Sequence, residues 1–490
     1  MYLILGAKSL PKDTTMPLID ITSFLNNAPP QPRGFRARHF PREEMLKPIL
    51  DMTGRMSNPR MFPISQIDLN VRELPNCNNY QPQSIPTMDI DPTAASVANF
   101  FELGKSRGED SLVELCESYI ADIQQPPYPV RCCITSGCSD SLTKLLMLFL
   151  RPNDVVLCEQ FGYPPTWAVI ESFGGKFAGV PCNLTEEGPV LKIDLLNSIL
   201  DRWPEEGTGY YAKPRILYLI LTHNPLGITY DHESRSKIYH LCQKHNLLII
   251  EDDPDGNIRL GDFDSYESYL LSRKHVSFLN MDEDGRVIRL ESFNKTLFPG
   301  LRLGFVAARQ EVINFMTMAS EVYSKAPSGV SQALFIKTLK LHGDGYHGYL
   351  QWCYKLSKEY KRRVSVFFKA IESTRSYRSG YIIPVKPDGG MFFLIKFCFP
   401  EGIPGLQTEE IYYMFLRRGL VVDLGTDMVS SLSEINNVDF VRLRVSNIAS
   451  DTLLKEAAHR FDEATFEYFL KFRHDGAIPI HQLVNIASDR

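Results

Sequence analysis

The sequence predicts an α/β protein in which a large, mostly parallel β-sheet has helices on both faces and is joined to a smaller α+β domain. Between about residues 100 and 310, short apolar runs alternate with amphipathic segments of helical length. Continuous Val, Ile and Leu runs are typical of strands that are buried on both faces. Beyond about residue 345 a long polar helix is followed by further strand signals. We therefore expect an N-terminal extension at 1–60, a large domain at 100–345, and a small domain formed by 61–99 and 346–490.

Six apolar runs are the expected strands of the large sheet. Several of them lead directly into polar or Gly-containing turns, and open α/β sheets bind their ligands in turns at the carboxyl ends of strands. The sequence therefore predicts a site at this edge of the sheet. The runs are 131–135, 155–158, 215–221, 247–251, 287–291 and 303–307, and the turns are 136–139, 222–227, 252–256 and 292–295.

The second domain is expected to begin with a long helix over 346–373. Strand signals follow at 390–397, 420–423 and 440–445, and a closing helix begins after Asp451. This order of elements favours a separate α+β unit.

Composition excludes several classes of protein. The 490 residues are 44% hydrophobic and 23% charged, which is typical of a globular chain. The net charge of -5 lacks the basic excess that nucleic-acid binding requires, and no apolar run approaches the roughly 20 residues that span a bilayer. The ten Cys form no CxxC pair, so we expect reduced thiols in a cytoplasmic protein without nucleic-acid or membrane partners. A basic stretch at 33–42 leaves mitochondrial import open.

Three patterns resemble ligand sites without the context that such sites need. The segment 343–348 matches GxGxxG but follows a helical stretch instead of a strand. The acidic run 251–255 lacks the alternating ligands of a calcium loop, and the His pairs 240/245 and 342/347 have no Cys or carboxylate at zinc-site spacing. We predict no metal site.

The segment 291–304 carries the most specific chemistry. Lys295 stands at the end of an apolar strand, with Ser292 and Asn294 before it and Arg302 after it. A lysine in apolar surroundings is suited to act as a nucleophile or Schiff-base partner, and an arginine offers a planar fork for phosphate. The segment resembles the S-x-x-K-x-x-x-P-G-x-R-x-G motif of the class I/II aminotransferases, which are fold type I enzymes that use pyridoxal 5'-phosphate.

Further segments match this family in the same order along the chain. The resemblance implies that Asn224 contacts the ring oxygen of the cofactor, that Asp252 pairs with the pyridine nitrogen, and that the Tyr163 ring stacks on the pyridine. It also implies that Gly137, Cys138 and Ser139 hold the phosphate. Arg442 aligns with the arginine that binds the substrate α-carboxylate, with Arg444 as a competitor two residues away. The segment 387–392 is similar to the kynurenine and 2-aminoadipate aminotransferase branch.

The resemblance implies a homodimer with the aspartate-aminotransferase fold. It also implies an enzyme that moves an amino group from an amino acid to a 2-oxo acid by a ping-pong mechanism, and specialised biosynthesis is one pathway that it allows. Lys295 would be the catalytic residue. The same residues also permit a carbon-sulfur lyase or an eliminase resembling aminocyclopropane-carboxylate synthase, because these reactions start from the same carbanion at Cα. A non-catalytic regulator or pseudoenzyme is the alternative from another class, against which the retained Lys295 argues.

Three positions depart from the family pattern. Leu103 replaces a tyrosine that reaches the phosphate in the partner subunit, and Cys138 replaces a serine, so cofactor binding is expected to weaken. Asp255 replaces a tyrosine that donates to the ring oxygen. An ionised carboxylate there would repel that oxygen, unless Asp255 instead turns away to cap the backbone at Gly256 and Asn257.

Overall fold

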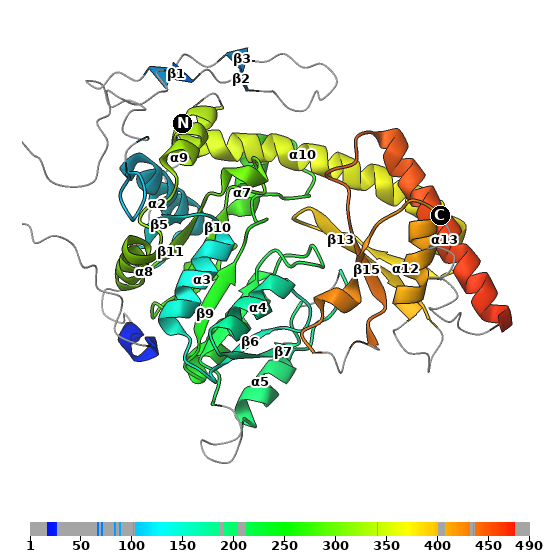
Figure 1. Cartoon of the computed structure of the whole chain (residues 1–490), viewed down its shortest axis with the longest axis horizontal. Helices are drawn as coiled ribbons and strands as arrows, with labels where there is room; N and C mark the ends of the chain where they lie inside the picture. The colour runs from blue at the N-terminus through cyan, green and yellow to red at the C-terminus, as the bar shows by residue number, and fades with distance from the viewer. Residues whose placement is uncertain are drawn as a thin grey trace, which may run out of the picture.

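A computed structural model describes residues 17–26, four two-residue strands between 66 and 89, residue 101, and residues 103–475 with gaps at 187–189, 204–211, 341, 400–406, 432–434 and 436. Figure 1 shows a large sheet flanked by helices and a second, smaller sheet beside it, with one long helix running from the first to the second. The expected extension at 1–60 and the segment 61–99 lie mostly outside the described residues. No helix in the described part of the chain is long and apolar enough to cross a membrane.

The large sheet has seven strands in the order β5-β11-β10-β9-β8-β6-β7. Only β11 runs antiparallel to its neighbours, β5 and β10, and the other pairs are parallel. The carboxyl ends of the parallel strands therefore meet at one edge of the sheet. The strands are β5 (Arg131–Thr135), β6 (Val155–Glu159), β7 (Lys176–Val180), β8 (Ile216–Ile220), β9 (Leu248–Asp252), β10 (Val287–Ser292) and β11 (Gly304–Ala308).

Each face of this sheet has its own apolar core, because successive side chains along a strand point to opposite faces. In β9, Ile249 packs in one core while Leu248 and Ile250 pack in the other. The first core is covered by α2 (Asp110–Gln124), α5 (Ile193–Asp201), α6 (His232–Lys244), α7 (Tyr266–Arg273) and α9 (Gly329–Leu339), and the second by α3 (Cys138–Phe149), α4 (Pro164–Ser172) and α8 (Gln310–Tyr323).

The second sheet is antiparallel, with the order β12-β13-β15-β14. Its strands are β12 (Ile382–Val385), β13 (Phe392–Phe397), β14 (Asp423–Leu424) and β15 (Phe440–Arg444). A third apolar core fills the space between this sheet and the helices α10 (Gly345–Glu372), α12 (Gln407–Arg417) and α13 (Asp451–Asp475). The short helix α11 (Arg375–Arg378) packs against α13. The long helix that Figure 1 shows between the two sheets is α10.

Short elements complete the described chain. The strand pairs β1 (Gln66–Ile67) with β4 (Met88–Asp89) and β2 (Asn70–Val71) with β3 (Gln83–Ser84) form two small sheets. Four 3₁₀ helices lie at Ile21–Phe24, Phe278–Met281, Pro299–Leu301 and Gly425–Met428.

In the two larger sheets the predicted strands agree with the structure within a few residues, except that β7 and β12 were not predicted. The two-residue strands β1 to β4 were not predicted either. The strand β7 is at the edge of the sheet, is only partly buried, and is not a continuous run of Val, Ile or Leu. The strand β12 is apolar, but it has only four residues and contains a proline, which is disfavoured inside strands. The expected strand at 420–423 is also shorter, because only Asp423 and Leu424 pair with β15. The GxGxxG match at 343–348 follows helix α9 and runs into α10, so a helix precedes it, as the sequence predicts.

Candidate active site

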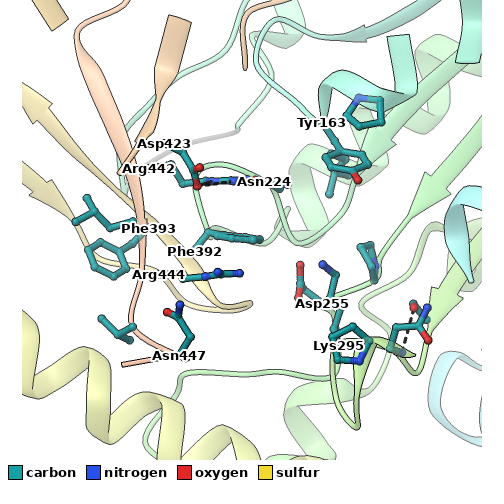
Figure 2. Close-up of a pocket in the computed structure, with 18 of the residues that line it drawn as sticks. Tyr163, Asn224, Asp255, Lys295, Phe392, Phe393, Asp423, Arg442, Arg444 and Asn447 are labelled. Atoms are coloured by element: carbon teal, nitrogen blue, oxygen red, sulfur yellow. Dashed lines mark hydrogen bonds and ion pairs between the residues drawn. The ribbon is translucent and has the colours of Figure 1, made fainter. Parts of the chain in front are cut away.

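A cavity of about 650 Å³ lies where the carboxyl ends of the large sheet face the second sheet. Figure 2 shows side chains entering it from both sides, with Lys295 and Asp255 on the side of the large sheet and Arg442 and Arg444 on the other. All the sequence-predicted site residues except Gly137 line this cavity. They are Cys138, Ser139, Tyr163, Asn224, Asp252, Asp255, Ser292, Asn294, Lys295, Arg302 and Arg442.

Lys295 lies three residues beyond the end of β10, in a turn that is tied to β11. The backbone N–H of Phe293 donates to the Leu303 carbonyl at 3.0 Å, and the N–H of Leu303 donates to Asn294 Oδ1 at 2.9 Å. The Phe293 ring is 1% exposed and packs on the Phe335 ring. The turn is thus held from both sides, while the Lys295 amine has no hydrogen-bond or ion-pair partner among the described residues.

The N-terminus of α3 forms a cradle that suits a phosphate group. Gly137, its N-cap residue, has a φ of 100° and offers no side-chain cap to the first N–H groups of the helix. A Cβ atom at Gly137 would lie 2.6 Å from Asn294 Nδ2 and 3.5 Å from Arg302 Nη2, so only glycine leaves this space open. Arg302 is held there by a 2.8 Å hydrogen bond from Nη2 to the Ser136 carbonyl. Unsatisfied helix N–H groups beside a guanidinium are a favourable environment for an anion.

Asp252, the last residue of β9, presents one carboxylate oxygen without a partner. Its Oδ2 accepts a 2.7 Å hydrogen bond from the Tyr218 hydroxyl, whereas its Oδ1 is buried and has no partner among the described residues. Burial raises the pKa of Asp252 to about 6, and hydrogen bonds from Tyr218 and Cys138 and the charge of Lys295 oppose that rise. The free oxygen suits an N–H donor such as a protonated ring nitrogen, and the Cys138 thiol points to this carboxylate.

The residues on either side of Asp252 fix its strand from behind. Glu251 and Asp253 both pair with Arg289, which is 0% exposed on the neighbouring strand β10. Arg289 Nη2 lies 2.8 Å from Asp253 Oδ2, and its Nε lies 2.7 Å from Glu291 Oε1. Sequence reasoning missed this network, although the alternation of side chains along a strand places Glu251 and Asp253 on the face opposite to Asp252.

Arg442, on β15, is held by three neighbours. Its Nε and Nη2 donate to Asp423 Oδ2 at 3.1 and 2.7 Å, and its Nη1 donates to Asn224 Oδ1 at 2.7 Å. Its guanidinium also lies over the Phe392 ring, 4.1 Å from the centroid. A guanidinium has five N–H donors, so one hydrogen on each terminal nitrogen stays available as a fork for a carboxylate.

Sequence reasoning missed Asp423 and Phe392 as neighbours of Arg442. The register contains the signal, because Asp423 lies opposite Arg442 in the antiparallel pair of β14 and β15. The sequence alone does not fix that register, since β14 has only two residues.

Asp255 follows β9 and enters the cavity. The residue is 3% exposed and its Oδ1 has no partner among the described residues. Burial raises its pKa to about 6, the charge of Lys295 lowers it, and the carboxylates of Asp253 and Asp252 raise it further. No hydrogen bond in the described chain joins its side chain to Gly256 or Asn257, so the alternative in which Asp255 caps that backbone is wrong.

Tyr163, Ser292 and Leu103 differ in their position relative to the cavity. Tyr163 precedes α4, is 43% exposed and lines the cavity near Asn224 (Figure 2). Ser292 Oγ accepts a hydrogen bond from the Asn294 N–H at 3.2 Å, beside Gly137. Leu103 is 58% exposed and does not line the cavity.

The comparisons with known proteins agree with this geometry. The model of the aminotransferase class I and II family matches residues 64–457. The chain belongs to this family. It is 29% identical over 473 residues to aromatic amino acid aminotransferase 2 of Saccharomyces cerevisiae, in an alignment that covers 87% of this chain and 91% of that protein. The crystal structure of an aromatic aminotransferase from C. albicans has a TM-score of 0.82 at 27% identity, covering 92% of this chain and 97% of that one.

More distant structures share the fold. A kynurenine aminotransferase from Pyrococcus horikoshii has a TM-score of 0.64 at 22% identity and covers 75% of this chain and 83% of that one. The predicted fold type I architecture and family are therefore confirmed. This chain is a pyridoxal-phosphate-dependent aminotransferase that moves an amino group from an amino acid to a 2-oxo acid, and the lyase, eliminase and regulator alternatives are not favoured.

Proposed function

We propose that the donor is an aromatic amino acid and that the acceptor is a 2-oxo acid, with the reaction centred on Lys295. The observation that carries this proposal is the convergence of an unpaired lysine amine, an unpaired oxygen of Asp252 and an uncapped helix N-terminus on one cavity. The curated relatives support the donor class, since their names describe aromatic amino acid and L-tyrosine:2-oxoglutarate aminotransferases.

The residues of the cavity fit the cofactor in three places. The N-terminus of α3 at Gly137, Cys138 and Ser139, together with Ser292 and Arg302, would hold the phosphate. Asp252 Oδ1 would accept from the ring nitrogen and keep it protonated, while Tyr163 would cover one ring face. Asn224 uses its Oδ1 for Arg442, so its Nδ2 stays free to donate to the ring oxygen, and Asn294 keeps the turn beside the phosphate in place.

The chemistry divides between the cofactor and the protein. The bound cofactor supplies an electron sink for the electron pair that the Cα–H bond releases. Lys295 Nζ would hold the cofactor in the resting enzyme, and its amine, once free, would take the proton from the substrate Cα and return it. The free fork of Arg442 binds the α-carboxylate and so fixes the direction of the Cα–H bond.

The walls of the cavity suit an aromatic side chain. Apolar and aromatic residues line the part of the cavity that the second sheet forms, and burial of an aromatic side chain is favourable in such surroundings. These residues are Phe367, Phe392, Phe393, Leu420, Val421, Val422 and Ile448.

A product assay tests the proposed function. The loaded enzyme is incubated with each amino acid and a 2-oxo acid, and the new amino acid, the new 2-oxo acid and ammonia are quantified. We expect one new amino acid per 2-oxo acid formed, with the highest kcat/KM for phenylalanine, tyrosine or tryptophan. Release of ammonia or thiol in place of a new amino acid would identify the lyase alternative instead.

We also propose a homodimer and a cytoplasmic location. Large apolar side chains stay exposed at Leu103, Phe298, Tyr323 and Val330, as is common at an interface between subunits. The nine cysteines that the structure describes form no disulfide, which is usual in a reducing compartment. Light scattering coupled to gel filtration would give twice the chain mass of 55.8 kDa for the dimer.

Within the chain, we assign 100–345 to the cofactor-binding domain and 61–99 with 346–490 to the small domain.

A further inference from the structure

Two arginines enter the cavity from the same strand, and their surroundings differ. Arg442 and Arg444 are two residues apart on β15, so they share a face of the sheet. Asp423, Asn224 and the Phe392 ring all engage Arg442. Arg444 also lines the cavity and is exposed, yet no hydrogen bond or ion pair of its guanidinium occurs among the described residues. Among the described residues, the Arg442 guanidinium thus has hydrogen-bond partners and the Arg444 guanidinium has none.

The Arg444 guanidinium faces the interior of the cavity. Figure 2 shows Arg444 extending below Phe392 and pointing across the cavity towards Asp255 and Lys295. Tyr360 of α10 lies near the same space. Burial and the charge of Asp255 raise the pKa of its hydroxyl, while the charge of Arg363, a hydrogen bond with Ser446 and the charge of Arg444 lower it. Asp255 Oδ1 has no partner, and no ion pair joins Asp255 to Arg444 in the described part of the chain. A ligand in the cavity would therefore meet an unneutralised positive charge.

We propose that Arg444 forms a subsite for the distal carboxylate of a dicarboxylic 2-oxo acid or amino acid, while Arg442 binds its α-carboxylate. This inference rests on the proposed function, because it concerns the acceptor half of the same reaction. It assigns to Arg444 a specificity-determining role that Arg442 does not have.

The spacing of the two arginines suits such a ligand. Residues i and i+2 of a strand are about 6.5 Å apart. The two carboxylate carbons of an extended five-carbon dicarboxylic acid are about 5 Å apart, as follows from C–C bonds of about 1.5 Å. Two long guanidinium side chains on one face can therefore contact both ends of one ligand, each with the bidentate geometry that carboxylates favour.

The same subsite is compatible with an aromatic donor. A guanidinium presents a flat face on which an aromatic ring can stack, and such stacking is favourable without any carboxylate. An aromatic donor would therefore use the apolar wall and the face of Arg444, whereas a dicarboxylic acceptor would use its N–H edge.

The test compares two acceptors in the loaded enzyme. Wild type, Arg444→Gln and Arg444→Lys are assayed with tyrosine as donor and with either 2-oxoglutarate or the monocarboxylic 2-oxopentanoate as acceptor. In Arg444→Gln we expect the loss of kcat/KM for 2-oxoglutarate to exceed the loss for 2-oxopentanoate at least about tenfold, because a hydrogen bond to a charged group contributes that much. Arg444→Lys keeps the charge without the fork and should show an intermediate ratio.

A binding measurement gives a second readout that does not depend on turnover. The Kd of glutarate, an unreactive dicarboxylate, should rise about tenfold in Arg444→Gln, while the Kd of pentanoate should rise far less. Arg378→Gln removes an equally positive but exposed side chain from α11, outside the cavity, and is the matched control in which both ratios stay at the wild-type value.

The outcomes separate the subsite from the proposed function. If Arg444→Gln lowers kcat/KM equally for both acceptors, and Asp255→Asn reproduces that loss, Arg444 is a partner of Asp255 in closing the site and the subsite is wrong. Equal glutarate affinity in wild type and Arg444→Gln also overturns it. If wild type transfers no amino group from tyrosine to either acceptor, the aromatic donor assignment fails, and the glutarate measurement still decides the subsite.

Discussion

Asp253 and Asp255 lie two residues apart and are both buried, at 2% and 3% exposure, yet the pKa values of their carboxyl groups shift in opposite directions. Asp253 pairs with Arg289 at 2.8 Å. Burial raises the pKa of Asp253, but the charges of Arg289 and Arg273 and the hydrogen bonds to its carboxylate together hold that pKa below its ordinary value. Asp255 has no such partner, and burial raises its pKa to about 6.

Buried charges that hold the large sheet together are paired, whereas charges that enter the cavity are not. Behind the sheet, Arg289 meets three carboxylates, those of Glu251, Asp253 and Glu291. In the cavity, the charged groups of Asp255, Lys295 and Arg444 face one another without pairing among the described residues. Of these three residues only Asp255 is buried. An unpaired buried charge is costly to stability, so it persists where a ligand can complete it.

The largest effect is expected from Lys295→Ala. In the proposed function the unpaired amine is both the tether and the proton carrier, so transamination should fall on the order of 10⁴-fold or more. Thermal unfolding should change little, since the amine holds no partner that the fold needs. A Lys295→Ala protein with wild-type turnover would show that another group carries the proton.

Arg289→Met tests the paired side of the comparison. Removing the shared partner leaves buried carboxylates uncompensated, which costs about 3–5 kcal/mol. Urea denaturation should show this loss in the free energy of unfolding, with Arg378→Gln as the exposed control that stays within about 0.5 kcal/mol of wild type. Equal stability of Arg289→Met and wild type would mean that the network is not what fixes the end of β9.

The variants Asp255→Asn and Asp253→Asn test whether the two pKa shifts have opposite effects on stability. The pKa of Asp255 rises from its ordinary 3.8 to about 6, so the folded state holds its proton more tightly than the unfolded state does. Its charge therefore destabilises the fold by up to about 3 kcal/mol above pH 6, at about 1.4 kcal/mol per pKa unit, and this penalty disappears below about pH 4.

Asp255→Asn should accordingly be more stable than wild type at pH 7, and the gain should vanish as the pH falls through 6 to 4. Asp253→Asn should lose stability at pH 7, because the low pKa of Asp253 marks a favourable charge whose contribution is lost only on acidification. Unfolding free energies measured from pH 4 to 8 check both signs. If the stability of the two variants relative to wild type depended on pH in the same way, the proposed difference between Asp253 and Asp255 would be wrong.

Arg442→Lys should have a smaller effect that falls on every substrate. Lys keeps the charge but not the fork, so kcat/KM should fall roughly 10- to 100-fold for all amino acids alike, as expected from the loss of one charge-assisted hydrogen bond. A uniform loss in Arg444→Lys with Arg442→Lys unaffected would exchange the roles of the two arginines.

Much of this site could be predicted from the sequence because its key residues follow strands. The motif around Lys295 and the turns after β5, β8 and β9 are local patterns, and the parallel topology brings them to one edge. The role of Asp423, the exposure of Arg444 and the network at Arg289 depend on register and on contacts between segments far apart in the chain. No local pattern encodes those contacts, so they required the structure.

The most direct test of the proposed transamination at Lys295 is a half-reaction followed by absorbance. Purified enzyme that contains the cofactor is mixed with tyrosine in the absence of an acceptor, in wild type and in Lys295→Ala. We predict that wild type converts the absorbance of the pyridoxal form to that of the pyridoxamine form, releases one 2-oxo acid per site, and regains the first spectrum when 2-oxoglutarate is added, whereas Lys295→Ala does none of these at a measurable rate. An unchanged wild-type spectrum with every amino acid tested, or release of ammonia without the pyridoxamine form, would contradict the account.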